Sequence, residues 1–286
     1  MKVRLPIDIV SAIRNIYKEQ NYYSRKLLRN LLLAYLGADI LWRKYGSIKD
    51  APLFYQFAFG IRVSQLLRHP LSICRIRHVD SNIRSIGENM IGRQGCSRMD
   101  NVLLYLMRYV LAKRFTQDDY VHVEIGTHHG GSLIATLMAL QDAHSSHKAI
   151  CIDPLDSYYG VSIDPQSAAP VDRATVEENV NRFCLPMRQV EIVKRYSTEK
   201  EAIDAVRERK VASLFIDGDH SYEGVKADWV NYSPFVVPGG YVLFHDYSNS
   251  RFPGIAEFVH KELIEWAKEW KIVGSMHILL LLRRRG

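Results

Sequence analysis

The sequence has few cysteines and no long apolar run. Of its 286 residues four are cysteines, which stand far apart without a C-x-x-C pair. This argues against a disulfide framework or a thiolate zinc cluster, and we expect a reducing, cytoplasmic compartment. The longest apolar stretch of the first half, residues 31–42, contains Asp39 and is shorter than the ~20 residues that a membrane-spanning helix needs. The first ten residues carry Lys2, Arg4 and Asp8 with no apolar core behind them, so we expect no signal peptide.

Internal repeats and low-complexity tracts are also missing. Hydrophobic residues make up 47% of the chain and charged residues 24%, which is the composition of a globular protein and excludes a wholly disordered one. At about 100–200 residues per domain, the length allows one large domain or two modest ones.

The charge is unevenly distributed. The chain carries a net +7, but residues 1–100 hold 17 Lys+Arg against 7 Asp+Glu, a net +10, whereas residues 101–286 have a net −3. An excess of this size points to an anionic partner without identifying it. The glycines at 87, 92 and 95 loosen the chain near the change of composition. We therefore predict a basic N-terminal extension over residues 1–100 and a main domain over residues 101–286.

The extension is predicted to be helical. Residues 9–17, 25–45 and 53–67 carry apolar residues at mixed three- and four-residue spacing, with basic residues between them. A helical extension of this kind packs on the main domain or on a second subunit of a homo-oligomer. The alternative is a basic amphipathic surface that makes peripheral contact with anionic lipid.

From residue 101 the pattern alternates between helices and short apolar strands. Thr175 with Glu178, and Thr198 with Glu201, have the spacing of helix-starting capping boxes. Residues 238–240, Pro-Gly-Gly, are predicted to form a turn. The predicted helices are 101–115, 132–140, 175–183, 198–209, 222–235 and 254–270. The predicted strands are 121–125, 149–152, 189–193, 212–216, 241–244 and a closing pair, 271–275 and 278–283. Short apolar strands that are each followed by a helix predict an α/β fold with a doubly wound, mostly parallel, seven-stranded sheet.

Ligands of such sheets bind beyond the carboxyl ends of the strands, so the residues there are the site candidates. The first strand ends in the segment from Glu124 to Ser132, where Gly126 permits a tight turn and close approach of a ligand. The dinucleotide fingerprint G-x-G-x-x-G is absent, because His128 stands at its second glycine. This disfavours a dinucleotide. A ligand with no phosphate that carries a ribose, an adenine and an amino-acid end could still fit, and Glu124 would face its positive group.

Acidic residues end three further strands. Asp153 follows the second strand and is predicted to accept hydrogen bonds from ribose hydroxyls; the alternative is a turn aspartate before Pro154. Asp217 and Asp246 end the fourth and fifth strands, where they could hold a divalent cation or simply cap helices and form turns. His220, three residues after Asp217, is a candidate general base or a structural histidine.

Histidines 128 and 129 lie near the same edge. Two or three histidines could make a transition-metal site there, but no H-x-x-x-H or similar spacing supports one.

Residues 121–286 resemble the class I S-adenosylmethionine-dependent methyltransferases. The local motifs are most similar to the small O-methyltransferases of the catechol and caffeoyl-CoA type and their bacterial relatives. The shared motifs are E-I-G-x-x-x-G-x-S at Glu124 to Ser132, the Asp-rich turn at Asp217 to Tyr222, the P-G-G segment at 238–240, and Asp246. The resemblance implies a Rossmann-like methyltransferase fold, S-adenosyl-L-methionine as cofactor and a divalent cation such as Mg²⁺.

The resemblance also implies a role for each matching residue. His220 stands where the catechol type has its base, so His220 and Asp217 would be catalytic. The family's second metal ligand after the fifth strand is usually Asn, but here it is Tyr247, and His245 is the nearest substitute. The implied cofactor residues are Glu124, Gly126, Thr127, Gly130 and Ser132 at the methionine end, Asp153 at the ribose, Ser197 near the adenine, and Asp217; the implied metal ligands are Asp217 and Asp246.

These observations predict an O-methyltransferase that acts on a hydroxyl of a small-molecule or sugar-containing acceptor. The loop 157–170, with Tyr158, Tyr159 and Asp164, is expected to cover the acceptor, and Arg93 to contribute. The alternatives are a nicotinamide-dependent oxidoreductase and a membrane-recruited nucleotide-binding module. An RNA methyltransferase ranks lower and no nucleic-acid partner is expected, because no N-P-P-Y type of motif follows the fourth strand.

Overall fold

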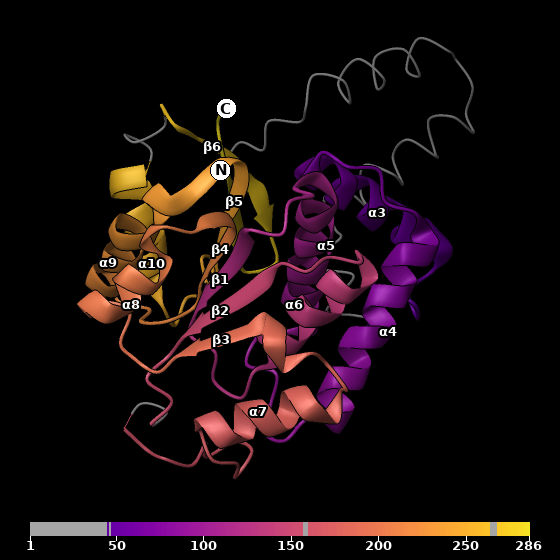
Figure 1. Ribbon diagram of the computed structural model, residues 1–286. Helices are drawn as coiled ribbons and strands as arrows, with labels where there is room; N and C mark the ends of the chain where they lie inside the picture. Colours follow the sequence, from indigo (N-terminus) through magenta and orange to yellow (C-terminus); the bar gives the residue numbers. More distant parts are fainter. Residues whose placement is uncertain (1–44, 46, 157–159, 264–267) are drawn as a thin grey trace, which may run out of the picture. The chain divides into compact units, whose positions relative to one another are not determined.

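A computed structural model describes residues 45, 47–156, 160–263 and 268–286 (Figure 1). The predicted helices 9–17 and 25–45 lie outside these residues, apart from Tyr45. The chain divides into two compact units, residues 1–77 and residues 78–286. Because residues 1–44 and 46 of the basic extension are not described, the division predicted at residue 100 stays a prediction.

The first unit contains one complete described helix, and it confirms the predicted segment. Helix α3 spans Leu53–Leu67 and ends at Arg68, which has a left-handed φ of 51°. The N–H of Arg68 donates to Gln65 O, and that of His69 donates to Ser64 O. Helix α4, Ile73–Asn89, runs across the division into the second unit. Gly87 lies inside α4, so it does not loosen the chain as expected. Among the helices that the structure describes, none is long and apolar enough to span a bilayer.

The second unit is built on the predicted seven-stranded sheet, which is confirmed. Its strand order is β3-β2-β1-β4-β5-β7-β6. The strands from β3 to β5 are parallel, and β7 is antiparallel to both of its neighbours. The order reverses between β1 and β4, which makes their carboxyl ends the topological switch point. The strands are β1 Tyr120–Ile125, β2 Lys148–Ile152, β3 Val190–Val193, β4 Lys210–Ile216, β5 Val236–Phe244, β6 Trp270–Met276 and β7 Leu279–Arg284.

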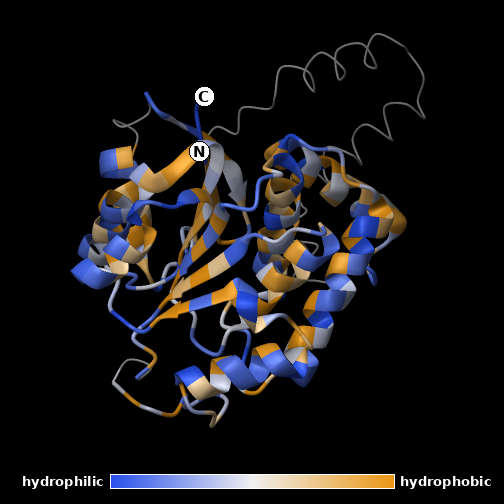
Figure 2. Ribbon diagram, viewed as in Figure 1, coloured by the Kyte–Doolittle hydropathy of each residue, from blue (hydrophilic) through white to orange (hydrophobic). Residues whose placement is uncertain are grey.

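Helices cover both faces of the sheet, as the alternating pattern predicts (Figure 1). Helices α5 and α6 lie on one face, and α8, α9 and α10 lie on the other. In Figure 2 the strands carry long hydrophobic stretches, whereas the outer helices alternate between hydrophilic and hydrophobic residues. The helices are α5 Arg98–Arg114, α6 Gly131–Asp142, α7 Arg173–Arg182, α8 Lys200–Arg207, α9 Tyr222–Tyr232 and α10 Pro253–Phe258.

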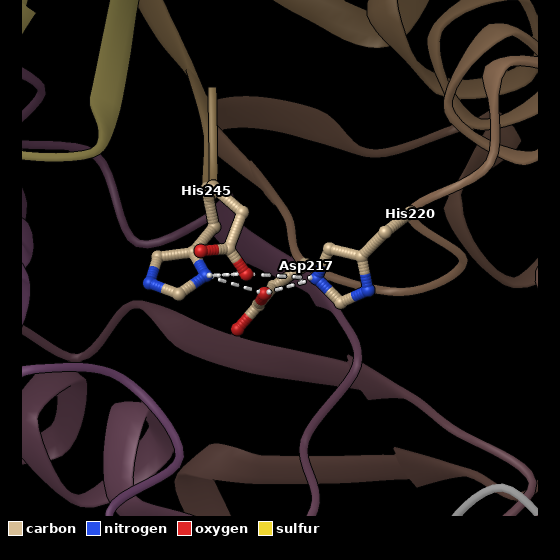
Figure 3. A group of neighbouring side chains, drawn as sticks. Asp217, His220 and His245 are labelled. Carbon is tan, nitrogen blue, oxygen red and sulfur yellow. Dashed lines mark hydrogen bonds and ion pairs between the residues drawn. The ribbon is translucent and has the colours of Figure 1, made fainter. Parts of the chain in front are cut away.

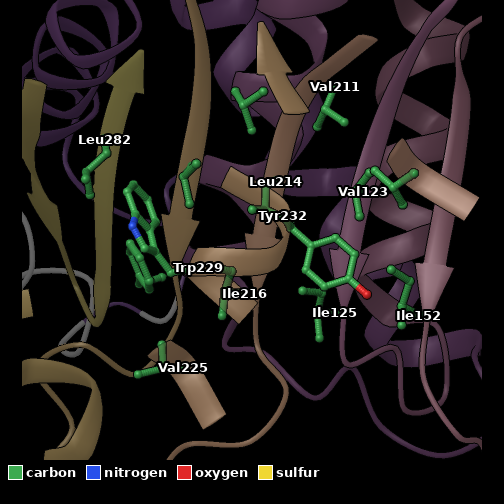
Figure 4. Packing of buried hydrophobic residues seen from close by; sticks show 14 of the residues in the cluster. Val123, Ile125, Ile152, Val211, Leu214, Ile216, Val225, Trp229, Tyr232 and Leu282 are labelled. Atoms are coloured by element: carbon green, nitrogen blue, oxygen red, sulfur yellow. The ribbon is translucent and has the colours of Figure 1, made fainter. Parts of the chain in front are cut away.

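The apolar core beneath α9 fixes the strand ends that carry the site. Trp229 and Tyr232 point from α9 toward the sheet and pack among residues such as Leu214 and Ile216 of β4 (Figure 4). All four side chains are at most 3% exposed. Burial of a large apolar side chain stabilises a fold by roughly 1.5–3 kcal/mol. The neighbouring loops after β1 and β4 are therefore anchored on a rigid base.

Three local predictions are wrong, because tertiary pairing or a nearer cap prevails over sequence spacing. The Pro-Gly-Gly segment 238–240 lies inside β5 rather than in a turn, where a register shift against β4 absorbs it. Helix α7 is capped by Asp172, which accepts from the N–H of Thr175, and not by Thr175 itself. Helix α8 has Glu199 at its N-cap position, one residue after Thr198, without a side-chain cap.

The predicted helix 254–270 is also wrong in length. Helix α10 ends at Phe258 and continues as a π-helical turn over Val259–Leu263. Trp270 begins β6 instead of ending a helix, because it packs in the core beside Trp229, with the rings tilted by 60° and their centroids 4.9 Å apart. The residues between, 264–267, are outside the described part of the chain.

Candidate active site

The loops after β1 and β4 cross at the switch point, and Gly126 makes the crossing possible. Gly126 has a φ of +87°, and a Cβ built on it would lie 2.1 Å from the carbonyl oxygen of Asp217. The N–H of Asp217 in turn donates to Ile125 O over 2.9 Å. Only glycine fits this position, so the backbone of the predicted first motif touches that of the Asp-rich turn.

The same loop leads into α6 and is held by Asp153. Oδ2 of Asp153 accepts from the N–H groups of Thr127 and His128, over 2.7 and 3.0 Å. Oδ1 accepts from the N–H of Leu155 over 2.8 Å. A carboxylate offers about four lone-pair sites, so these bonds leave room for a further donor. The predicted ribose contact of Asp153 is compatible with this geometry and stays a prediction.

Gly130 provides a start to α6 that no side chain caps. It occupies the N-cap with a φ of 87° and makes no side-chain hydrogen bond. A helix start of this kind presents its first N–H groups, together with the positive end of the helix dipole, to an anionic group. The predicted roles of Gly130 and Ser132 at the methionine end of the cofactor are compatible with this helix start and stay predictions.

Glu124 lies deeper than its predicted role suggests. It is 1% exposed, and its Oε2 accepts from Nη1 of Arg108 over 3.2 Å. Its Oε1 accepts from the hydroxyl of Ser132 over 3.2 Å. Burial raises the pKa of Glu124, and the charge of Arg108 opposes this shift. The cation nearest to Glu124 is therefore Arg108 of α5, and its predicted contact with a positive ligand group stays untested.

Ser197 lies after β3, partly buried beside α9. Its carbonyl oxygen accepts from the hydroxyl of Tyr232 over 2.7 Å. Asp228 of α9 lies close by, 1% exposed, and burial raises its pKa to about 7, although the Ser197 side chain opposes the shift. Oδ2 of Asp228 also lies close to Gly218 of the Asp-rich turn. A Cβ built on Gly218 would be 3.3 Å from this oxygen. An adenine placed here by Ser197, as expected, would lie above a buried carboxyl group.

The structure brings four predicted or neighbouring residues together at the ends of β4 and β5 (Figure 3). Nε2 of His220 lies 3.3 Å from Oδ1 of Asp217 and 3.2 Å from Oδ2 of Asp246. Nδ1 of His245 lies 2.8 Å from the same oxygen of Asp217 and 3.3 Å from that of Asp246. Two oxygens and two nitrogens thus converge from opposite sides. We call Asp217, His220, His245 and Asp246 the Asp/His cluster.

The electrostatics of the Asp/His cluster follow from this convergence. Burial would lower the pKa of His220, but bonds to Asp217 and Asp246 outweigh it and raise the pKa to about 9. Burial would raise the pKa of Asp217, but His245 and His220 lower it to about 2. The two carboxylates are therefore ionised at neutral pH and favour a cation between them, whether an imidazolium or a metal ion.

Three residues that the sequence did not single out hold the Asp/His cluster in place. The thiol of Cys96 donates to Oδ2 of Asp217 over 3.3 Å, and burial with the charge of Asp217 raises the thiol pKa to about 12. The amide of Asn249 donates to Oδ1 of Asp246 over 2.7 Å. Oδ2 of Asp100, at the start of α5, lies 3.4 Å from Nε2 of His245. Asn249, three residues after Asp246, was visible locally; Cys96 and Asp100 were not, because they lie more than 100 residues away.

Tyr247, which departs from the resembled motif, points away from the Asp/His cluster. Its hydroxyl lies 2.9 Å from Nε2 of His260, and its ring packs against the core beneath α10. The resembled motif usually has an asparagine at position 247. Here the amide group near Asp246 belongs to Asn249, and it donates a hydrogen bond to Asp246.

Two further predicted residues meet beside the first motif. Nε of Arg93 donates to Oδ2 of the buried Asp164 over 2.8 Å, which holds the segment after the undescribed residues 157–159. Tyr158 and Tyr159, expected to cover the acceptor, lie outside the described residues. His128 and His129 stack edge to face near Asp164, which Arg93 already neutralises.

A cavity of about 790 Å³ lies away from these residues. It is lined by residues at the end of α6, the start of β2 and the segment before β3, including Lys148, Cys184 and Arg188. It contains none of the predicted site residues, and its position at the amino end of β2 is opposite to the switch point.

A doubly wound sheet with antiparallel β7, a glycine crossing at the switch point and acidic residues after β2, β4 and β5 defines the class of S-adenosylmethionine-dependent α/β methyltransferases. The family profile described as a methyltransferase domain matches residues 123–247. The chain belongs to this family, the class I S-adenosylmethionine-dependent methyltransferases. It is therefore a methyltransferase, and the nicotinamide-dependent alternative is set aside.

Two curated proteins and a solved structure are similar to parts of this chain. The uncharacterized protein R132 of Acanthamoeba polyphaga mimivirus is 32% identical over 183 residues, which cover 62% of this chain and 71% of that protein. The uncharacterized protein y4gI of Sinorhizobium fredii is 30% identical over 129 residues, 43% of this chain and 13% of that protein. The crystal structure of CalS11, a calicheamicin methyltransferase, shares the fold with a TM-score of 0.51 at 16% identity, over 65% of this chain and 79% of that one.

Proposed function

We propose that this protein transfers the methyl group of S-adenosylmethionine to a hydroxyl of a small-molecule or sugar-containing acceptor. The observation that carries the proposal is the Asp/His cluster, which lies directly beside the crossing of Gly126 and Asp217. Ionised carboxylates and imidazoles suit the removal of a proton from a hydroxyl, which is the step that O-methylation requires. CalS11 is described as a TDP-rhamnose 3'-O-methyltransferase, which supports a sugar hydroxyl as acceptor.

The cofactor would lie along the loop after β1. S-adenosylmethionine would supply an electrophilic methyl group on a positively charged sulfur. Gly126, Thr127 and the start of α6 would hold its methionine end, with Glu124 and Ser132 beneath them. Asp153 would hold the ribose, and Ser197 would lie near the adenine. This arrangement points the reactive end toward Asp217, where β1 and β4 are neighbours.

The acceptor would lie over the Asp/His cluster, with its hydroxyl aligned with the methyl group. Holding both partners at close range removes much of the entropic part of the barrier. His220 stands at the outer side of the cluster, stacked on Phe252 with ring centroids 4.3 Å apart. Asp217 and Asp246 raise its pKa to about 9 and keep the free ring protonated. A cation bound between the two carboxylates would lower this pKa, and His220 could then receive the hydroxyl proton. As the oxygen bonds to the methyl carbon, the carbon–sulfur bond breaks and S-adenosylhomocysteine leaves.

A divalent cation is part of the proposal. Asp217 and Asp246 present oxygens on one side of the cluster, and their ionised state suits the charge of such an ion. A bound cation would act as a Lewis acid that lowers the pKa of the acceptor hydroxyl. The resemblance of residues 121–286 to the methyltransferases implies a divalent cation such as Mg²⁺. The choice of ion depends on the donor atoms of the Asp/His cluster.

The test is methyl transfer itself. The full-length protein is incubated with S-adenosylmethionine and a panel of nucleotide sugars, glycosides and catechols, with and without a chelator. We expect S-adenosylhomocysteine to form with at least one hydroxyl acceptor, and the product to gain one methyl group on oxygen by mass spectrometry and NMR. Methylation of a nitrogen or carbon atom on the acceptor that turns over best would contradict the proposal.

The proposed partners of the basic N-terminal part are kept separate from this reaction. We retain an anionic membrane surface or a second subunit as its partner and no nucleic acid, since the positive charge is concentrated in residues 1–100. Two measurements on the full chain distinguish a membrane surface from a second subunit. The first is binding to anionic vesicles at low and high salt, and the second is the mass of the protein in solution.

A further inference from the structure

The donor atoms of the Asp/His cluster match the first coordination sphere of a small ion. Nδ1 of His245 lies 2.8 Å from Oδ1 of Asp217 and 3.3 Å from Oδ2 of Asp246. Neighbouring ligands of a six-coordinate ion with bonds of ~2.1 Å lie ~3.0 Å apart, whereas bonds of ~2.4 Å to Ca²⁺ space them ~3.4 Å apart. The observed spacing therefore fits a small ion better than a large one.

The contacts of His245 are also incomplete without an ion. His245 is 5% exposed, yet within the described part of the chain neither ring nitrogen has a partner in hydrogen-bonding geometry. The carboxylate oxygens are near enough, but they do not lie along the direction of a ring N–H bond. A buried polar atom without a bonded partner is costly, and a metal ion between the three donors would satisfy it.

Each of these donors is held from behind by another side chain. The thiol of Cys96 occupies Oδ2 of Asp217, and the amide of Asn249 occupies Oδ1 of Asp246, so Oδ1 and Oδ2 respectively face inward. Oδ2 of Asp100 faces Nε2 of His245. Partners that fix the orientation and the protonated nitrogen of a ligand are typical of metal sites.

Asp100 is itself fixed and ionised. It is 1% exposed, its Oδ1 lies 3.0 Å from Nδ1 of His277, and its Oδ2 accepts from the hydroxyl of Ser97 over 2.5 Å. Asp100 thus faces Nε2 of His245, and Nδ1 is left as the ring nitrogen that faces Asp217 and Asp246.

We propose that Asp217, Asp246 and Nδ1 of His245 bind one transition-metal ion of the Mn²⁺ to Zn²⁺ series in preference to Mg²⁺, and that Asp100 is the positioning residue that makes His245 a ligand. An imidazole nitrogen binds such ions well and Mg²⁺ poorly, because Mg²⁺ prefers oxygen donors. The inference rests on the cation of the proposed function. Three protein ligands leave open positions for an acceptor hydroxyl, and His220 remains beside them.

The experiment titrates the full-length protein with each metal alone. Calorimetry gives the affinities for Mg²⁺, Mn²⁺, Co²⁺ and Zn²⁺, and the visible absorption of bound Co²⁺ reports on nitrogen ligation. We expect one site, with Co²⁺ and Zn²⁺ bound at least ~100-fold more tightly than Mg²⁺. His245→Gln should weaken Co²⁺ binding by at least ~30-fold and Mg²⁺ binding by less than ~3-fold.

Asp100→Asn tests the positioning role. It should weaken Co²⁺ binding ~10–100-fold and shift the Co²⁺ absorption bands while His245 is still present. A purely structural role would lower the melting temperature of the metal-free protein without changing the preference among the ions. The matched control is His144→Asn, which removes an exposed histidine that already has a left-handed φ of 53° and follows α6 at the other edge of the sheet.

Two outcomes would overturn the inference. The first is Mg²⁺ binding as tight as Co²⁺ binding in the unaltered protein, a result that does not depend on whether any variant folds. The second is Co²⁺ binding that is as tight in folded His245→Gln as in the control His144→Asn. Because neither measurement contains S-adenosylmethionine or acceptor, failure here is distinct from failure of the methyl-transfer assay.

Discussion

The backbone of Gly126 passes so close to Asp217 that a Cβ on the glycine would lie 2.1 Å from the carbonyl oxygen of the aspartate. This contact joins the loop after β1 to the loop after β4, and therefore joins the proposed cofactor site to the Asp/His cluster. A side chain cannot be added at residue 126 without separating the two.

The first prediction concerns this contact. Gly126→Ala should weaken the binding of S-adenosylhomocysteine more than tenfold and destabilise the protein by about 1–3 kcal/mol, because it combines a clash with a strained φ of +87°. Calorimetry and urea unfolding measure the two effects. Gly160→Ala is the control: Gly160 has a φ of +85°, but no atom of the described residues lies within 4 Å of its added Cβ. Equal effects of the two substitutions on ligand binding would refute the role of the clash.

The second prediction concerns His220. His220→Ala should lower the turnover of the accepted hydroxyl compound ~10²–10⁴-fold, the usual contribution of a general base. The affinity for S-adenosylhomocysteine should change less than about twofold, because His220 faces the acceptor side and not the first motif. Single-turnover kinetics and calorimetry provide the two readouts. Unchanged turnover in His220→Ala would contradict the assignment of His220 as the general base.

The third prediction concerns the buried pair of Arg108 and Glu124. Arg108→Met leaves the carboxyl group of Glu124 buried without a cation, which should cost about 3–5 kcal/mol of unfolding free energy. The double variant Arg108→Met with Glu124→Met should be more stable than the single one. Urea unfolding at neutral pH checks both, and a double variant less stable than Arg108→Met would contradict the explanation.

The pH dependence of the Arg108→Met variant follows from the same burial. Without Arg108, the folded-state pKa of Glu124 lies still further above its unfolded value. The folded state then binds the proton more tightly, so stability is lost as pH rises. We expect the deficit of the variant to shrink when unfolding is repeated near pH 5.

The fourth prediction concerns Asp228, whose pKa burial raises to about 7. An aspartate whose folded-state pKa exceeds its unfolded value contributes stability that is complete below about pH 4 and is lost as pH rises toward 7. Asp228→Asn removes this dependence. Relative to the unaltered protein, the variant should gain about 2–3 kcal/mol between pH 5 and pH 8, at ~1.4 kcal/mol for each unit of pKa shift.

Unfolding in urea at several pH values measures this gain. Asp219 is exposed, and its negative charge contributes to the raised pKa of Asp228. Asp219→Asn should therefore reduce the trend without abolishing it. A flat difference between Asp228→Asn and the unaltered protein across this range would show that Asp228 is already ionised in the folded state at pH 5.

The sequence predicted the fold well where periodicity and strand length carry the information. The seven strands and their alternation with helices follow from short apolar runs, since a strand buried on both faces needs them. Local capping signals were less reliable. Asp172 caps α7 in place of Thr175, and the Pro-Gly-Gly segment is absorbed into β5, because sheet pairing outweighs the turn preference of those residues.

The sequence by itself determined which carboxylates stand at the strand ends, because Asp217 and Asp246 each follow an apolar strand directly. Only the tertiary structure decided what surrounds them. Cys96 lies 121 residues from Asp217, and His277 lies 177 residues from Asp100. Contacts over such separations depend on strand order and register, which place the start of α5 and the turn between β6 and β7 beside the ends of β4 and β5. No local spacing encodes that proximity, so the residues that orient the Asp/His cluster emerge only from the packed fold.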